Sequence, residues 1–272
     1  MIKIENITYK IGHTTILNNI NLTIPNGGIT ALIGANGAGK STLLSLIARL
    51  NPIQAGKIWL NDMDIATAPS RTIAQNLAIL TQDNVIHSRI TVQDLLFFGR
   101  YPHHQGRPTE EDKSIIQAAL KRFDLDAFAY RFLSELSGGQ RQRALIAMTF
   151  CQKTDHVLLD EPLNNLDMFH ARELMRLLRQ LTNELALTTV MVVHDINMAA
   201  AYADIIVAMK NGEIAMIGTP EDIITKANLK RYLIWMRKCW NIKESGWWCI
   251  ICSICYFLYL LQRKVRWFSQ VF

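Results

Sequence analysis

Apolar and polar residues follow two distinct patterns along this chain. Residues 1–10, MIKIENITYK, alternate between apolar and polar positions as a half-buried strand does. Three later runs, at residues 29–33, 156–159 and 188–193, are almost continuously apolar or β-branched, which is typical of strands buried on both faces of a parallel sheet. The pattern therefore predicts a compact α/β chain.

The stretch between Gln82 and Ser137 has a helical pattern. Thr91 can cap one helix, and Thr109, which is followed by three acidic residues, can begin another. A third helix is expected after residue 137, because the apolar residues Leu145, Ile146, Met148 and Phe150 suit a helix that packs on one side. The segment GRYPHHQGR contains two histidines that are either metal ligands or solvated side chains. Because they are adjacent and cannot easily share one ion, we favour solvation.

Charge divides the chain into two unequal parts. Residues 1–233 hold 23 Lys or Arg and 22 Asp or Glu, whereas residues 234–272 hold 6 and 1. A near-neutral main body has no basic stripe that could follow a nucleic-acid backbone, so we expect no nucleic-acid partner. Because residues 1–10 alternate like a strand and hold no continuous apolar stretch, we expect neither a secretory signal nor an N-terminal membrane anchor. Nothing in residues 1–233 is long and apolar enough to span a bilayer.

The segment 234–272 has an unusual composition. It holds four of the five cysteines and five of the six tryptophans, and its apolar run WWCIICSICYFLYLL has 15 residues, whereas a membrane span needs roughly 17 to 25. Cys249, Cys252 and Cys255 have a metal-like spacing but lack a fourth ligand. The segment is an atypical, poorly packed or partly disordered end, a membrane-associated stretch, or the product of a shifted reading frame, and the sequence leaves these interpretations open.

A glycine-rich loop joins the run at 29–33 to a helix that should begin near Lys40. The segment GANGAGKS matches G-x-x-x-x-G-K-[ST], with Gly34, Gly39, Lys40 and Ser41 at the fixed positions. Glycines leave the backbone N–H groups free to surround phosphates, and the helix N-terminus adds its positive dipole end. The motif predicts that Lys40 reaches the β- and γ-phosphates of a nucleotide and that the Ser41 hydroxyl ligates Mg²⁺.

Two further apolar runs end in ionisable residues. The run at 156–159 is followed by Asp160 and Glu161, and the run at 188–193 is followed by His194. Parallel strands end at a common sheet edge, so these side chains should meet the phosphate loop there. We expect Asp160 to hold Mg²⁺ through water and Glu161 to act as general base on the attacking water. His194 is either a core histidine or a sensor of the terminal phosphate, and its place at a strand end favours the second role.

A second glycine segment, SGGQ at residues 137–140, precedes the third predicted helix. Gly138 and Gly139 leave its first N–H groups uncovered and Ser137 can cap it, so the segment forms a second anion receptor. Because the first loop already holds one triphosphate, this receptor serves either another ligand or the nucleotide of another subunit. Spacing alone does not decide between them.

The motifs GANGAGKS, LSGGQRQR, VLLDEP, NNLD and VVHD, in this order over residues 1–233, resemble those of ABC-transporter ATPase subunits. The resemblance implies an α/β P-loop NTPase fold with a mainly parallel sheet core, an N-terminal antiparallel β subdomain, and a helical signature subdomain inserted at about residues 88–150. It implies that SGGQ of one chain closes on the γ-phosphate held by the phosphate loop of a second copy. Two ATP molecules would then lie between two chains, and the enzyme would need a dimer to hydrolyse ATP.

The resemblance also assigns residues one by one. Tyr9 matches the aromatic that stacks on adenine, Gln82 matches the glutamine that contacts Mg²⁺, and Asp167 matches the acid that couples the two sites. Asn164 or Asn165 stands where the family more often has a small residue, a mild departure. The implied ATP-binding set comprises Tyr9, Gly34, Asn36, Gly37, Gly39, Lys40, Ser41, Thr42, Ser137, Gly138, Gly139, Gln140 and Asp167; the implied metal set is Ser41, Gln82 and Asp160, and the catalytic set is Glu161, His194 and Gln82.

Within that family, FGRYPHHQGR, LDEPLNNLDMFHA and VVHDINMAAAYAD are similar to ATPase subunits of bacterial iron-siderophore importers, a group that includes haem and vitamin B12 importers. The resemblance implies a peripheral ATPase on the cytoplasmic face of the inner membrane, a separate permease and, indirectly, a substrate-binding protein. A soluble ABC protein that acts without a transporter is an alternative, although it would need a tandem cassette or a coiled-coil insertion, and neither is visible. A P-loop GTPase would normally carry N-K-x-D, which does not occur.

Overall fold

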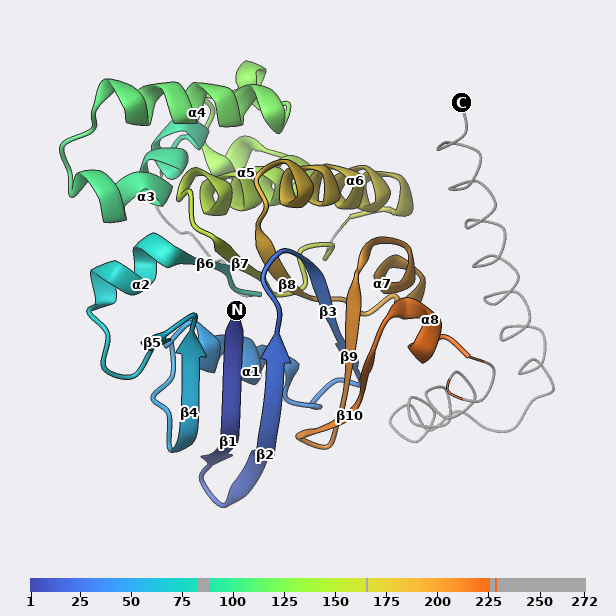
Figure 1. The fold of residues 1–272 in the computed structure, drawn as a ribbon. Coiled ribbons are helices and arrows are strands. Elements are labelled where there is room, and N and C mark those ends of the chain that lie inside the picture. Colours follow the sequence, from blue (N-terminus) through green and yellow to red (C-terminus); the bar gives the residue numbers. More distant parts are fainter. Residues whose placement is uncertain (83–88, 165, 226–227, 229–272) are drawn as a thin grey trace.

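The computed structural model describes residues 1–82, 89–164, 166–225 and 228 of the chain, and within them two β-sheets are present (Figure 1). The smaller sheet is antiparallel, with strand order β2-β1-β4-β5. Its strands are β1 (Ile2–Ile11), β2 (Thr14–Ile24), β4 (Ala55–Leu60) and β5 (Met63–Asp64). The alternation at residues 1–10 therefore does form a strand, as predicted.

The larger sheet has six strands in the order β10-β9-β3-β8-β7-β6. All neighbouring strands pair in parallel except the hairpin of β9 and β10. The three continuous apolar runs form its centre, which confirms the prediction of a mainly parallel core. Its strands are β3 (Gly28–Gly34), β6 (Leu77–Leu80), β7 (His156–Leu159), β8 (Thr188–Val192), β9 (Ile205–Lys210) and β10 (Glu213–Gly218).

The six-stranded sheet lies between two hydrophobic cores. Ile29, Ala31 and Ile33 of β3 point into one core, which they share with the long helices, whereas Leu32 points into the other. That second core also holds the inward face of the small sheet and the helix α1 (Lys40–Ile47). Since both faces of the sheet are covered, its strands have the unbroken apolar sequence seen above.

Several helices cover the other face of the large sheet, and in Figure 1 α4, α5 and α6 lie above it. Thr91 caps α3 by accepting a hydrogen bond from the Asp94 amide, and Thr109 forms a capping box with Asp112 at the start of α4. Both helix starts confirm the sequence prediction. The helices of the described residues other than α1 are α3 (Val92–His104), α4 (Glu110–Arg122), α5 (Gly138–Cys151), α6 (Met168–Glu184), α7 (Ile196–Tyr202), α8 (Pro220–Ile223) and α2 (Ser70–Asn76), and Ile73 of α2 packs into the second core. Short 3-10 turns lie at Asp126–Phe128 and Leu133–Glu135.

The adjacent histidines of GRYPHHQGR lie at the end of α3. The ring of His103 contacts the Gln152 carbonyl at 2.8 Å, and the ring of His104 contacts the Phe97 carbonyl at 3.2 Å. Within the described part of the chain, no cluster of His, Cys, Asp and Glu suited to a metal ion is found.

Two sequence predictions fall outside the described residues. The composition break near residue 233, with the apolar run and the three closely spaced cysteines that follow it, lies in the segment 229–272. The beginning of the segment expected to be helical, up to residue 88, is likewise outside them. Among the residues that are described, no helix has the length and apolar character needed to cross a bilayer.

Candidate nucleotide-binding and catalytic site

The phosphate loop, defined here as residues 34–41, joins the end of β3 to the start of α1, as the motif predicted. Gly39 is the N-cap of α1 and has a φ of 95°, in the left-handed region that favours glycine. A Cβ at this position would lie 2.6 Å from Cδ2 of Leu17, so packing against the small sheet also requires glycine here. The conformation leaves the first amides of α1 without side chains in front of them.

Lys40 is 5% exposed, and its ammonium donates hydrogen bonds to two carbonyl oxygens of the loop. The Nζ atom lies 2.9 Å from the Gly34 oxygen and 3.0 Å from the Ala35 oxygen. Burial lowers the pKa of Lys40, and the nearby charges of Glu161 and Asp160 oppose that shift. A buried cation whose bonded partners are neutral carbonyls suits an anionic ligand such as a phosphate.

Asp160 and Ser41 meet beside Lys40. The Ser41 hydroxyl donates to Oδ1 of Asp160 at 3.0 Å, and Asp160 is only 6% exposed. Burial raises the pKa of Asp160, and the neighbouring Glu161 adds to that increase while the bond from Ser41 opposes it. A hydroxyl and a carboxylate are the oxygen ligands that Mg²⁺ prefers, so these two side chains fit such an ion.

Glu161 is the centre of a polar cluster at the end of β7. Its carboxylate accepts a hydrogen bond from Nε2 of Gln82 at 2.9 Å and lies 2.5 Å from Nε2 of His194, and the Asn164 amide also donates to it. Burial alone would raise the pKa of Glu161, but the bonds from Asn164 and His194 and the positive charges nearby lower it overall. The backbone of Glu161 has a φ of 51°, which is uncommon for a residue with a side chain and often marks functional positions.

The structure brings most of the predicted phosphate-side residues to one cavity of about 380 Å³. Asn36, Gly37, Gly39, Lys40, Ser41, Thr42, Gln82, Glu161 and His194 line it. Gly34 and Asp160 do not line the cavity, but each accepts a hydrogen bond from a residue that does: Gly34 from Lys40 and Asp160 from Ser41.

Tyr9 is not part of this cavity, contrary to the expectation that it stacks on the base. It is 9% exposed and packs in the core between the two sheets, where it pairs with Leu17 across β1 and β2. The apolar end of the cavity is formed instead by Ile11 and Ile16. The sequence signal for Ile11 was weak: it is an apolar residue at the last position of a strand, and it is 60% exposed.

The SGGQ segment begins α5, as expected. The Ser137 hydroxyl accepts from the Gln140 amide, and the Gln140 side chain accepts from the Ser137 amide at 3.0 Å, so the two residues form a capping box. Gly138 and Gly139 are the first two residues of the helix. No side-chain Cβ covers the backbone at these positions, as an anion receptor at a helix N-terminus requires.

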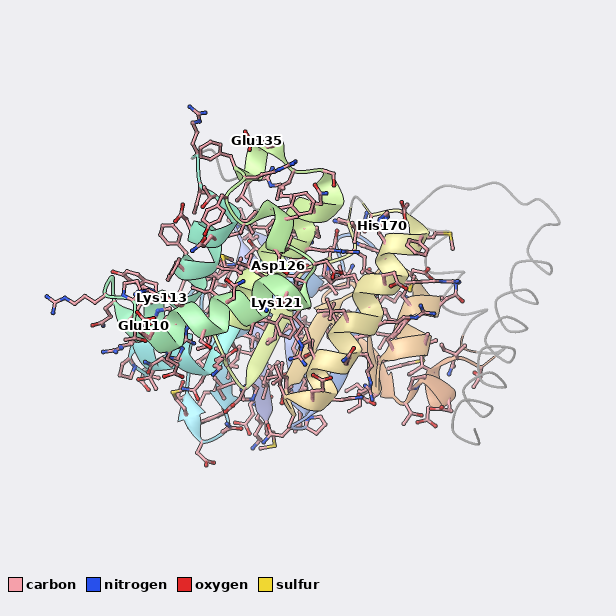
Figure 2. All side chains as sticks on the ribbon, turned by 90° about the horizontal axis from the view of Figure 1, so that it is seen from above. Glu110, Lys113, Lys121, Asp126, Glu135 and His170 are labelled. Carbon is pink, nitrogen blue, oxygen red and sulfur yellow. The ribbon has the colours of Figure 1, made fainter. Side chains whose placement is uncertain are left out.

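A second cavity, of about 490 Å³, lies at this segment. Ser137, Gly139, Gln140 and Asp167 contribute to its lining, together with Arg143 and His170. Asp167 caps α6 by accepting from the His170 amide at 2.9 Å, and its other oxygen lies 2.8 Å from the ring of His170, which Figure 2 labels on α6. Hydrogen bonds from the backbone and side chain of His170 lower the pKa of Asp167. Among the described residues, this cavity shares no lining residue with the first, so the two glycine segments line separate cavities within one chain.

Comparison with known proteins places the chain in a family. Residues 17–164 match the family model described as ABC transporter. The chain is 46% identical over 230 residues to the petrobactin import ATP-binding protein YclP of Bacillus subtilis (strain 168), covering 85% of this chain and 91% of that protein. It is 38% identical over 229 residues to the ferric enterobactin transport ATP-binding protein FepC of Escherichia coli (strain K12), covering 84% of each.

Solved structures agree with this assignment. A dimeric structure of the ATP-binding cassette MJ0796 in a post-hydrolysis state, bound to ADP and phosphate, matches with a TM-score of 0.72 at 28% identity, covering 81% of this chain and 99% of that one. The chain therefore belongs to the ABC transporter family, as a P-loop ATPase of the kind that couples ATP hydrolysis to transport.

Proposed function

We propose that this ATPase energises the import of an iron(III)-siderophore through a separate membrane permease, from a peripheral position on the cytoplasmic face of a bacterial inner membrane. The similarity to the petrobactin import and ferric enterobactin transport ATP-binding proteins supports the substrate class. The evidence comes from relatives and not from a pocket of this chain, because the substrate does not touch this subunit. Import of haem, vitamin B12 or another metal chelate is the alternative. A substrate-binding protein delivers the chelate to the permease and reaches this chain only indirectly.

The observation that carries the hydrolytic role is the cluster of Lys40, Ser41, Asp160 and Glu161 around one cavity. In this proposal the amides of the phosphate loop and the Lys40 ammonium bind the β- and γ-phosphates of ATP. Ser41, Asp160 and Gln82 hold Mg²⁺, and that ion neutralises charge on the phosphate oxygens when bound. Asn36, Gly37 and Thr42 line the same phosphate-binding region.

Glu161 is the proposed general base. Its lowered pKa keeps it ionised at neutral pH, so it can accept a proton from the attacking water. Gln82 and His194 hydrogen-bond to the two oxygens of this carboxylate and so fix its orientation. His194 in addition senses the terminal phosphate from the same sheet edge.

The second cavity supports a site shared between two chains. Because Ser137, Gly138, Gly139 and Gln140 form an anion receptor outside the chain's own nucleotide cavity, we propose that they bind the γ-phosphate held by a second copy. Asp167 couples the two sites across that dimer. ATP then closes the dimer, and hydrolysis releases it.

An apolar hollow on α3 supports a place for the permease. It has a volume of about 690 Å³, and it is lined in part by Phe97, Phe98 and Tyr101. Phe98 and Tyr101 are 62% and 56% exposed, which is unusual for aromatic side chains on a helix. We propose that a short cytoplasmic helix of the permease docks here, so that movement of the helical part, about residues 88–150, is passed to the membrane.

The test is uptake of radioactive iron, supplied on a panel of siderophores and as haem, by cells that lack the protein. Uptake from one siderophore class should be lost, and it should return with the wild-type chain but not with the Glu161→Gln chain. The chain should also co-purify with a membrane permease. Unchanged uptake from every siderophore, or loss of haem uptake alone, would contradict the proposed substrate.

A further inference from the structure

The side chain of Gln152 joins two elements that carry different halves of the catalytic machinery. Gln152 follows α5 directly, and its carboxamide nitrogen donates to the carbonyl oxygens of Ala74, at 2.5 Å, and Leu77, at 3.1 Å. Ala74 lies in the last turn of α2, and Leu77 is the first residue of β6. One side chain thus satisfies a carbonyl at the end of α2 and another at the foot of β6.

The opposite ends of α5 and β6 both lead to residues of the proposed sites. Helix α5 has 14 residues, so it is about 21 Å long, and the SGGQ segment stands at its first turn. Strand β6 ends at Leu80, and Gln82, two residues further on, bonds to Glu161. Gln152 therefore connects the far end of the SGGQ helix to the strand that positions Gln82.

Neighbouring bonds make this junction stiff on the helical side. Arg100, which is buried, donates to the Cys151 carbonyl at 3.0 Å and to Oδ1 of Asp112 at 2.8 Å, and so links α3, α4 and the end of α5. The Gln152 carbonyl itself receives the His103 ring at 2.8 Å. A displacement of α5 is thus shared by the helices packed on it.

The same junction is tied to the sheet on its other side. Arg71 and Gln75 of α2 donate to the Pro102 carbonyl near the end of α3, both at 3.2 Å. His156, the first residue of β7, contacts the carbonyl of Asn76 at 3.3 Å, and β7 leads to Asp160 and Glu161. The carbonyls of Ala74 and Leu77 thus belong to a segment that leads into β6 and is held against β7.

We propose that Gln152 is a positioning residue for ATP hydrolysis: it couples the placement of the SGGQ helix to the placement of Gln82 against Glu161. The proposal rests on the proposed function, in which SGGQ acts on the nucleotide of a second copy. When the SGGQ segment is drawn onto that nucleotide, α5 shifts at its far end, and the two hydrogen bonds of Gln152 carry the shift to the foot of β6. Hydrolysis is then favoured only when the receptor is engaged.

The experiment replaces Gln152 by leucine, which keeps the approximate volume but removes both donated hydrogen bonds, and by glutamate, which puts a second acceptor against the two carbonyls. The matched control is Gln117→Leu on α4, because the Gln117 side chain makes only a 3.4 Å bond to Asp126 at the surface. Gln152→Lys is the rescue variant, since its ammonium can donate to the same carbonyls. Steady-state ATPase kinetics and the affinity for a fluorescent ATP analogue are measured for each chain.

We expect Gln152→Leu and Gln152→Glu to bind the analogue within about twofold of wild type, because the phosphate loop is untouched, and to lose kcat by about tenfold, since small misplacements far from the reacting atoms have large effects on rate. The proposed shared site predicts that the wild-type rate depends cooperatively on ATP concentration, and these two variants should lose that cooperativity. Gln117→Leu and Gln152→Lys should keep both properties. Circular dichroism checks that each variant folds. If Gln152→Leu or Gln152→Glu does not fold, the other of these two variants is compared with wild type.

Two results would overturn the proposal. One is a wild-type kcat and cooperativity in Gln152→Leu and Gln152→Glu; the other is a rate loss that Gln152→Lys does not rescue, which would mean that the rate does not depend on the two donated hydrogen bonds. The proposed function is checked separately with the wild-type chain: if its turnover does not depend on a second copy, the shared site itself fails. If wild type depends on a second copy and Gln152→Leu behaves like wild type, only the role of Gln152 fails.

Discussion

Replacing Arg100 by methionine should destabilise the helical part that carries SGGQ. Arg100 and Asp112 have side chains that are 5% and 4% exposed, and their bond of 2.8 Å joins α3 to the first turn of α4. Methionine keeps much of the packing volume but removes the guanidinium, so the Asp112 carboxylate stays buried with only the bonds from Thr109. The Cys151 carbonyl also loses its donor.

The magnitude follows from the burial of the pair. Removing one partner of a buried ion pair costs about 3–5 kcal/mol, and the two remaining bonds to Thr109 favour the lower end. A loss of about 3 kcal/mol should lower the melting temperature by roughly 10 °C in a protein of this size. Urea unfolding monitored by circular dichroism measures the first quantity, and differential scanning fluorimetry measures the second.

The control is Lys113→Met. The pair of Lys113 and Glu110 lies on the outer face of α4 (Figure 2), with side chains 58% and 87% exposed, so its loss should cost at most about 0.5 kcal/mol. If Arg100→Met also changed the free energy of unfolding by less than about 1 kcal/mol, the reasoning from burial would be refuted.

Acid provides a second readout of the same pair. Burial alone would raise the pKa of Asp112, but hydrogen bonds from Thr109 and Arg100 outweigh it and lower the pKa from 3.8 to about 2. The folded state thus binds the proton less readily than the unfolded chain does. The stability that this carboxylate contributes is complete above about pH 4 and is lost as the pH falls towards 2. The difference between wild type and Arg100→Met should therefore narrow on acidification in this range.

Three further predictions concern the nucleotide site. Glu161→Gln should keep ATP binding but slow phosphate release by at least about a hundredfold, because the general base is lost. The variant should also accumulate an ATP-dependent dimer on size-exclusion chromatography. Rapid phosphate release would count against the role of Glu161. Lys40→Ala should bind a fluorescent ATP analogue about tenfold to a hundredfold more weakly, since charge-assisted hydrogen bonds contribute about 1.5–3 kcal/mol, while Lys113→Ala should bind normally. Tyr9→Leu should leave the dissociation constant for the ATP analogue unchanged, whereas Ile11→Ala should raise it, because Ile11 lines the cavity and Tyr9 does not. The opposite result would restore Tyr9 as the residue that contacts the base.

Much of the sheet and its edge could be predicted because local signals and burial agree there. The continuous apolar runs formed the central strands, and the glycine loop placed the start of α1 at Lys40. Parallel strands that end together brought Asp160, Glu161 and His194 to the edge beside Lys40. The capping threonines fixed the starts of α3 and α4. The roles of these residues in hydrolysis remain predictions.

Tyr9 shows where a residue assignment taken from the resemblance failed. A register shift in β1 between Ile4 and Ile7, with Asn6 at a φ of 53°, sets which residues of the strand face inward, and it places Tyr9 in the core. The spacing of Ile2, Ile4, Ile7 and Tyr9 already carries this change of phase, and it assigns Tyr9 to the inward-facing series.

Two other residues gain their significance only from contacts seen in the folded chain. Asn164 appeared to be a mild departure from the family, yet its amide donates to Glu161. Gln152 shows no signal in the sequence, because its partners, Ala74 and Leu77, are more than seventy positions away.

The most direct test of the shared site is the rate of ATP hydrolysis per chain as the protein is diluted, with the fraction of dimer measured on the same samples by analytical ultracentrifugation. If SGGQ of one copy completes the site of another, the rate per chain must fall in proportion to the dimer and approach zero for the monomer. A monomer that hydrolyses ATP at the full rate would contradict the account.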